Sequence, residues 1–180
     1  MLLRSSIFIS LFLFLFSFSI YADGNWCIQD PKNPPCNGAP GRCTRNFDGS
    51  EGGFVAETAY VELVMVGGLS RNRPHIGLHV SICDAAMITG NAKVSGNARV
   101  HEEAQVYGAA WVFGNSQVYG NARVFGDAQV YGAAEVSGDA RVYGDEAQVY
   151  GDARVFGDAQ ILGDARISEH TVISTGNYGF

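Results

Sequence analysis

Four cysteines are the first residues in this sequence whose type and spacing bear on chemistry. Cys27, Cys36 and Cys43 lie close together in a segment rich in proline and glycine, and Cys83 lies further along the chain. An even set of cysteines indicates disulfides in an exported protein, and a metal site or reactive thiols in a cytoplasmic one. The set contains no Cys-x-x-Cys pair, and no histidine lies near its first three members, which disfavours zinc. We therefore expect all four cysteines to form disulfides, with a metal site as the alternative.

The N-terminal residues indicate export, which is the condition that disulfides need. Arg4 precedes an apolar run from Ile7 to Ile20, and Ala22 offers a small residue before a cut at Asp23. The run is short for a membrane span, so it predicts a signal peptide over residues 1–22, with an uncleaved anchor as the alternative. We expect a secreted, periplasmic or envelope-associated protein that has no membrane span in its mature form.

A six-residue repeat positions most of the remaining residues. From Ile82 onward the sequence runs in units such as VFGNSQ, VYGNAR and VFGDAQ. The alanine and the valine of a unit are two residues apart, so both point to one face of a short strand. Glycine followed by asparagine or aspartate favours a tight turn. Each unit is therefore a short strand and a corner, and successive coils must stack to bury the Val, Ile and Ala side chains.

This pattern predicts an all-β parallel β-helix over residues 55–180. Residues 55–60 and 76–81 fit the repeat and enclose an interruption at 67–75, which we expect to be an external loop. Residues 23–54 show no sustained periodicity and predict a loop-rich, disulfide-stapled lead-in rather than regular structure.

The unit VYGDEAQ contains one residue more than its neighbours. We expect the extra residue to form a local bulge at Asp145–Glu146. Val142 and Val149 should then both point inward, because a change of register would turn every later valine to solvent.

The run of V-x-G-[ND]-A-x units resembles the hexapeptide-repeat, left-handed parallel β-helix proteins, from Val55 to about Tyr178. The resemblance implies three units per triangular coil and a left-handed sense, which general chirality rules do not predict. Many members of that family are acyltransferases that work as trimers, a smaller group are zinc-dependent carbonic anhydrases, and others are non-enzymatic. A trimer is therefore the homo-oligomer that the resemblance favours.

Four histidines are the candidates for catalysis: His75, His79, His101 and His170. The related acyltransferases use a histidine as general base near an external loop, and the interruption at 67–75 is such a loop. No partner residue is identifiable, however, and acyl-CoA is a cytoplasmic donor that an exported enzyme would not meet. His75 and His79 would supply only two zinc ligands, and the HxAxxH-type block of the anhydrases is missing. We assign no catalytic residue, no metal and no cofactor.

Aspartates recur in the turn position of the repeat, at Asp127, Asp139, Asp145, Asp152, Asp158 and Asp164. Carboxylates from neighbouring coils could hold calcium. Asparagine takes the same position in other units without charge, at Asn91, Asn97, Asn115 and Asn121. Plain turn formation is therefore the interpretation that we prefer.

With three units per coil, the outward side chains sort into three faces. One face carries Tyr107, Phe125, Tyr143 and Leu162, and another carries His101, Tyr119 and Phe156, interrupted by Ser137. The third combines aromatic rings with amides and is our candidate binding face: Trp111, Phe113, Gln129, Tyr131, Gln148 and Tyr150. We expect a flat platform there that contacts a second subunit or a polysaccharide, whereas aromatic stacking for stability alone is the simpler interpretation.

Charge narrows the function classes further. The formal net charge is −6, and basic and acidic residues balance as far as Ser81, so the whole negative excess lies in the repeat. Such a surface repels phosphate backbones and excludes nucleic acid as a partner. The sequence predicts a secreted, non-enzymatic scaffold or binding protein that self-associates or binds a cell-wall or surface glycan. An envelope-associated hexapeptide-repeat acyltransferase is the alternative.

Overall fold

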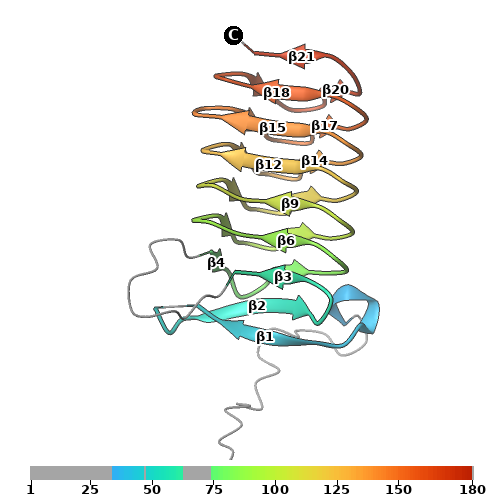
Figure 1. The fold of residues 1–180 in the computed structure, drawn as a ribbon. Helices are drawn as coiled ribbons and strands as arrows, with labels where there is room; N and C mark the ends of the chain where they lie inside the picture. Colours follow the sequence, from blue (N-terminus) through green and yellow to red (C-terminus); the bar gives the residue numbers. More distant parts are fainter. Residues whose placement is uncertain (1–33, 47, 63–73, 180) are drawn as a thin grey trace, which may run out of the picture.

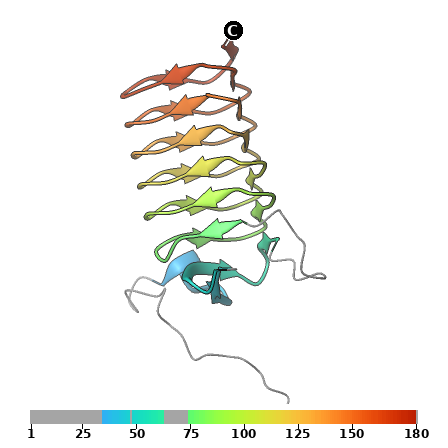
Figure 2. The same cartoon turned by 90° about the vertical axis from the view of Figure 1, so that its left-hand side faces the viewer.

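The protein folds into a stack of coils, as predicted. The computed structural model describes residues 34–46, 48–62 and 74–179. The coils form one column with β1 and β2 at one end and the C-terminus at the other (Figure 1). In the perpendicular view, the strands of successive coils lie directly above one another (Figure 2). The all-β parallel β-helix is therefore confirmed, while its left-handed sense stays a prediction.

Three parts of the sequence prediction lie outside the described residues. They are the signal peptide over residues 1–22, residues 23–33 of the lead-in with Cys27, and residues 67–73 of the external loop. Within the described ranges, no helix is long and apolar enough to span a membrane.

Three sheets run along the column, and they are parallel throughout except for β1. Sheet A contains β1 (Gly41–Arg45), β2 (Glu51–Ala56), β5 (Ser81–Ile82), β8 (Arg99–Val100), β11 (Gln117–Val118), β14 (Glu135–Val136), β17 (Arg154–Val155) and β20 (Val172–Ile173). Sheet B contains β3 (Tyr60–Val61), β6 (Met87–Ile88), β9 (Gln105–Val106), β12 (Arg123–Gly126), β15 (Arg141–Gly144), β18 (Gln160–Leu162) and β21 (Asn177–Tyr178). Sheet C contains β4 (His75–Ile76), β7 (Lys93–Val94), β10 (Trp111–Val112), β13 (Gln129–Val130), β16 (Gln148–Val149) and β19 (Arg166–Ile167). One turn of 3-10 helix, η1 (Pro35–Gly38), precedes β1.

Strands one coil apart pair in register because each coil contains three six-residue units. Val94 pairs with Val112, and Val112 pairs with Val130. The backbone N–H of Phe113 donates to the carbonyl of Val130 at 2.9 Å, which is one rung of the regular ladder between coils. The three units per coil that the resemblance implies are therefore confirmed.

Two columns of small apolar side chains fill the interior. One is the valine or isoleucine of each unit and the other is the alanine two residues before it, as in Val112 and Ala110, and both are fully buried. Ser116 replaces the alanine in one unit and is also fully buried. Its hydroxyl donates to the carbonyl of Phe113 at 2.9 Å, so the polar group in the core is satisfied.

Glycines let the coils stack closely at the corners. Gly114 and Gly132 both have a φ of 76°, and the N–H of Asn115 donates to the carbonyl of Gly132 at 2.6 Å. A Cβ on Gly114 would lie 2.8 Å from the carbonyl oxygen of Gly132. The backbone conformation and the close approach of the next coil therefore both favour glycine.

The extra residue of VYGDEAQ leaves the register unchanged, as predicted. Val142 pairs with Ile161, and Val149 pairs with Ile167. Val142 and Val149 are both fully buried, whereas Asp145–Glu146 are exposed at the corner. The additional length is accommodated outside the ladder.

The lead-in contains regular structure, so that part of the sequence prediction is wrong for its described residues. β1 and β2 form an antiparallel hairpin in which Cys43 pairs with Phe54. The hairpin turn contains Asp48 and Gly49, a residue pair typical of such turns. The hydroxyl and the backbone N–H of Ser50 donate to the Asp48 carboxylate, and these hydrogen bonds hold the pKa of Asp48 below its usual value.

The lead-in also closes the first edge of sheet C through the side chain of Asn46. Its amide nitrogen donates to the carbonyl of Ile76 at 2.9 Å, and its amide oxygen accepts from the N–H of Ile76 at 2.8 Å. Asn46 is buried, and it supplies to β4 the two hydrogen bonds that a further strand would supply. This contact protects an edge that would otherwise be open to pairing.

A disulfide joins the lead-in to the coil above it. Cys36 and Cys83 are bonded, with their Cα atoms 5.3 Å apart. Cys43 is also disulfide-bonded, and the described part of the chain contains no free cysteine. The predicted oxidation is therefore confirmed for these three. Disulfides such as Cys36–Cys83 typically add about 2–4 kcal/mol of stability.

Replacing Gly132 by alanine should destabilise the protein more than replacing Gly49. Both glycines have positive φ, 76° and 83°, so each alanine carries a conformational cost of about 1–2 kcal/mol. A Cβ at Gly132 would also lie 2.8 Å from the backbone nitrogen of Gly151, whereas one at Gly49 has no neighbour within 4 Å. We expect Gly132→Ala to lose about 1–3 kcal/mol more in urea unfolding. Equal losses would mean that coil contact does not constrain the corner.

Replacing Asn46 by alanine should expose the first edge of sheet C. The change leaves the N–H and the carbonyl of Ile76 without their partner, at a cost of about 1–3 kcal/mol. Hydrogen–deuterium exchange at the Ile76 amide should accelerate as well. The matched control is Asn97→Ala, which removes an exposed amide contact to Asn115 and should cost about 0.5 kcal/mol or less. Unchanged exchange at Ile76 would contradict the capping role.

Candidate functional site

Sheet C brings the six residues of the candidate binding face together over three successive coils. Trp111 is in register with Gln129, and Gln129 with Gln148. The three other rings follow the inward valines of the same strands. We call this set the sheet C patch: Trp111, Phe113, Gln129, Tyr131, Gln148 and Tyr150. The predicted sorting of these side chains onto one face is confirmed, whereas their role in binding stays a prediction.

The rings of the sheet C patch stack on one another instead of lying flat. The Phe113 and Tyr131 centroids are 4.8 Å apart with an interplanar angle of 7°, and those of Tyr131 and Tyr150 are 5.1 Å apart at 5°. The distance matches the spacing of the coils, so successive rings can stand on edge and cover each other's faces. The platform that we expected is therefore built mainly from ring edges.

Trp111 departs from this arrangement and is the most accessible ring of the patch. It is 41% exposed, and it is tilted by 38° against Phe113 with the centroids 4.6 Å apart. Its indole N–H donates to the Ser95 hydroxyl at 3.3 Å, and the Lys93 ammonium lies 5.8 Å from the ring centroid. Trp111 therefore remains partly exposed to solvent at one end of the stack.

The sheet C patch contains no charged side chain. Lys93 and Arg166 bound it along sheet C, and the Arg166 guanidinium lies 3.7 Å from the Glu146 carboxylate. Within the patch, the Tyr131 hydroxyl donates to the amide oxygen of Gln148 at 3.2 Å. The centre of this face is therefore neutral, half-buried and internally hydrogen-bonded.

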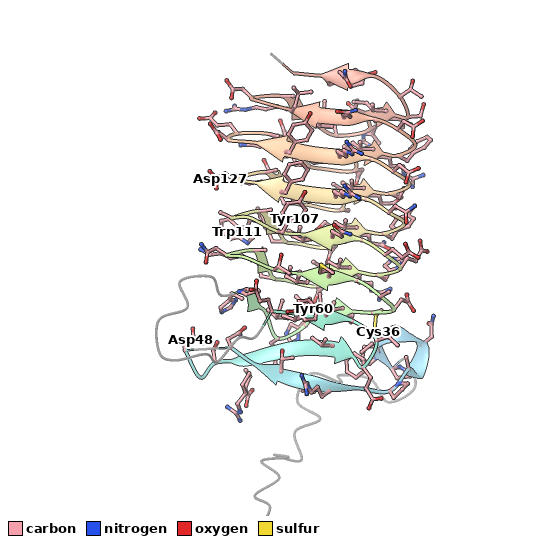
Figure 3. All side chains as sticks on the ribbon, in the orientation of Figure 1. Cys36, Asp48, Tyr60, Tyr107, Trp111 and Asp127 are labelled. Atoms are coloured by element: carbon pink, nitrogen blue, oxygen red, sulfur yellow. A yellow bond between two sulfur atoms is a disulfide. The ribbon has the colours of Figure 1, made fainter. Side chains whose placement is uncertain are left out.

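Sheet B carries a second column of rings. Tyr107 and Phe125 stack with centroids 4.8 Å apart, and Phe125 and Tyr143 stack at the same distance. Figure 3 looks onto this sheet and shows rings in a column above the labelled Tyr107. The Tyr143 hydroxyl donates to the amide oxygen of Gln160 at 3.2 Å. Sheet A has only a short stack, in which His101 and Tyr119 lie 5.0 Å apart, before Ser137 interrupts it.

The histidines do not form a site together. His75, the last residue of the loop that we predicted at 67–75, lies in β4, and His79 is exposed at a corner. The His101 Nδ1 is 3.9 Å from the Glu102 carboxylate, and the exposed His170 Nε2 is 3.7 Å from that of Asp152. In the described residues, no group of three or more His, Cys, Asp or Glu side chains is arranged to hold a metal ion.

The corner acids and amides link neighbouring coils. Asn121 donates to the Asp139 carboxylate at 3.0 Å, which agrees with the turn interpretation. The sequence analysis missed three acidic residues that take the position of a corner glycine with positive φ, namely Asp84, Glu102 and Glu169. Glu102 has a φ of 60°, and its carboxylate accepts from the N–H of Gly120 at 2.8 Å, while the Asp84 carboxylate accepts from the N–H of Glu102 at 3.1 Å. The missing glycine in the units ICDAAM, VHEEAQ and ISEHTV was the available signal.

Comparison with known proteins supports the repeat and no specific activity. A family model described as the YdcK beta solenoid repeat matches residues 116–132 and 147–163. Each matched stretch contains three consecutive strands, one from each sheet. Searches of curated proteins and of solved structures found no match. The matched repeat and the stacked coils agree, and the chain is a β-solenoid repeat protein.

Proposed function

We propose that this protein is an exported, non-enzymatic scaffold that self-associates through the sheet C patch. The observation that carries the proposal is a neutral, aromatic strip over three coils in a chain whose formal net charge is −6. Covering an apolar strip of this kind lowers the free energy, because each aromatic side chain buries roughly 150–250 Å² in a complete contact.

A second copy of the chain is the partner that fits best. In a symmetric contact, the same patch meets itself around the symmetry axis, so a charged centre would place like charges together. The centre of sheet A contains Glu135, and the centre of sheet B contains Arg123 and Arg141. The centre of sheet C contains only rings and amides, which tolerate their own copy. The resemblance to hexapeptide-repeat proteins favours a trimer, in which the patch meets its own copies where it lies on the three-fold axis.

Export is supported by the cysteines. Disulfides persist in oxidising compartments and are rare in the cytoplasm, and Cys36–Cys83 closes a long stretch of chain. An extracytoplasmic location also agrees with the apolar run that begins at Ile7.

A glycan is the second candidate partner, and Trp111 is the observation that favours it. Its ring is partly open, and Gln129 beside it offers an amide to sugar hydroxyls. The faces of the stacked rings are less suitable, because neighbouring rings cover them. An acyltransferase is less well supported, since the four histidines lie on separate strands and corners.

Replacing Gln129 by glutamate should break the self-association. Gln129 lies between Trp111 and Gln148 in the register of sheet C, so the new carboxylates would face each other across a symmetric contact. We expect the association constant to fall by about ten-fold or more in sedimentation velocity of the exported protein. Trp111→Ser should weaken association in the same assay and leave the fold intact, because the side chain points away from the core.

The matched control is Gln117→Glu, which makes the same substitution on sheet A between Arg99 and Glu135. It should leave association within about two-fold of wild type, because surface changes outside a contact have small effects. A wild-type protein that stays monomeric, or equal losses in the two glutamate variants, would contradict the proposal. Retention on insoluble glycan that depends on Trp111, without self-association, would favour the second candidate.

A further inference from the structure

Sheet B holds an unusual pair of charges. Arg123 in β12 and Arg141 in β15 are in register on neighbouring coils, and both side chains are exposed. We call them the arginine pair. In the described strands, no other register pair joins two permanent cations. Like charges directly opposite one another destabilise a sheet, so the stability of the fold does not explain why two arginines are paired here.

The arginine pair is not neutralised by the protein. Elsewhere, the guanidinium of Arg154 lies 3.6 Å from the Glu135 carboxylate, and that of Arg166 lies 3.7 Å from Glu146. Neither Arg123 nor Arg141 forms an ion pair with any described residue. The carboxylate of Asp139, two residues before Arg141, accepts a hydrogen bond from Asn121. Two guanidinium groups therefore remain available side by side on an acidic protein.

The ring column beside the arginine pair has the same electrostatic preference. Phe125 and Tyr143 lie two residues after the arginines on the same strands, and their planes are within 2° of parallel. Rings that stack face to face direct their edges to solvent, and the edge of an aromatic ring carries partial positive charge. The C–H edge of Phe125 and the guanidinium groups therefore both favour an anionic group.

Amides extend the arginine column in both directions. Gln105 is in register with Arg123, and Gln160 with Arg141. The Gln160 oxygen accepts the Tyr143 hydroxyl, which leaves the amide N–H₂ as a donor. The face thus offers two cations between two neutral polar groups, at the coil spacing of about 4.8 Å.

We propose that sheet B binds an acidic polysaccharide, a chain of uronic acids, along the axis of the solenoid. Arg123 and Arg141 would hold carboxylates, and the flanking glutamines would bond to sugar hydroxyls. A uronate chain carries one carboxylate per sugar, which suits cations that recur once per coil. This face is distinct from the sheet C patch, and the inference does not depend on self-association.

The exposed acids at the corners favour such a ligand over nucleic acid. Asp127 and Asp145 follow the sheet B strands, and Asp139 and Asp158 precede them. Duplex DNA carries one charge per roughly 1.7 Å of its axis, so many phosphates would lie near these carboxylates without a cation. A sparsely charged glycan places fewer anions along the same length.

The test is binding of polygalacturonate oligomers by isothermal titration calorimetry, at low and moderate salt. Wild-type protein should bind, and the double variant R123Q/R141Q should lose at least about ten-fold in affinity, because charge-assisted hydrogen bonds are lost. Both side chains point to solvent, so circular dichroism should be unchanged. Neutral dextran of similar length should not bind, and neither should a DNA duplex.

The matched control is R99Q/R154Q, which removes the same number of charges from sheet A, where the two arginines are not neighbours. It should bind polygalacturonate within about two-fold of wild type. No binding by wild-type protein would overturn the proposal. Equal losses in the two arginine variants would also overturn it, since only overall charge would then matter. Stronger binding of DNA than of polygalacturonate would assign the arginine pair to another class of polyanion.

Discussion

The hydrogen-bonded contact between successive coils is the interaction on which this structure depends. Most strands are only two residues long and have no stability by themselves, so each requires the strand of the coil above or below. The ladder fixes one spacing for every column of side chains. Valines, corner glycines and outward rings all repeat at this spacing, and each column must tolerate contact with its own copy. Valines and alanines pack on their own copies in the core, glycines let the backbones approach at the corners, and flat rings stack on one another outside.

The repeat made most of the fold predictable. Six-residue periodicity gave the inward positions of Val112 and Val149 and the grouping of Trp111 with Tyr131, because stacking copies leaves few alternatives. The hairpin at the first edge was not predicted, since it occurs once and follows no period. The Asp48–Gly49 pair was a local signal for its turn, but the contact from Asn46 to Ile76 joins distant residues and cannot be read from spacing. Ring orientation was also missed, because periodicity gives the direction of a side chain and not its rotation about that direction.

The three faces share one interior but differ in surface chemistry. The neutral rings and amides of sheet C favour a like surface, whereas the two neighbouring arginines of sheet B favour an anion. Sheet A alternates cations, amides and an acid, as in Arg99, Gln117, Glu135 and Arg154. Because the core uses only the valine and alanine positions, each face can vary without effect on the others. A solenoid of this kind can therefore carry more than one binding function without a cavity.

The corner at Asp145–Glu146 shows how such a chain can change its length during evolution. A single added residue is absorbed at the corner, because the next alanine returns to the ladder. Gain of a complete coil would lengthen all three faces and leave each column in place. Gain of a single six-residue unit would preserve the core equally well, yet it would move every later outward residue to the neighbouring face. Trp111 and Tyr131 would then no longer share a column if the unit were inserted between them. Selection for folding alone would permit related chains to differ in length by single six-residue units. Selection for a binding face would permit only differences of whole coils, each of three units. The lengths of related chains would therefore show which of the two was selected.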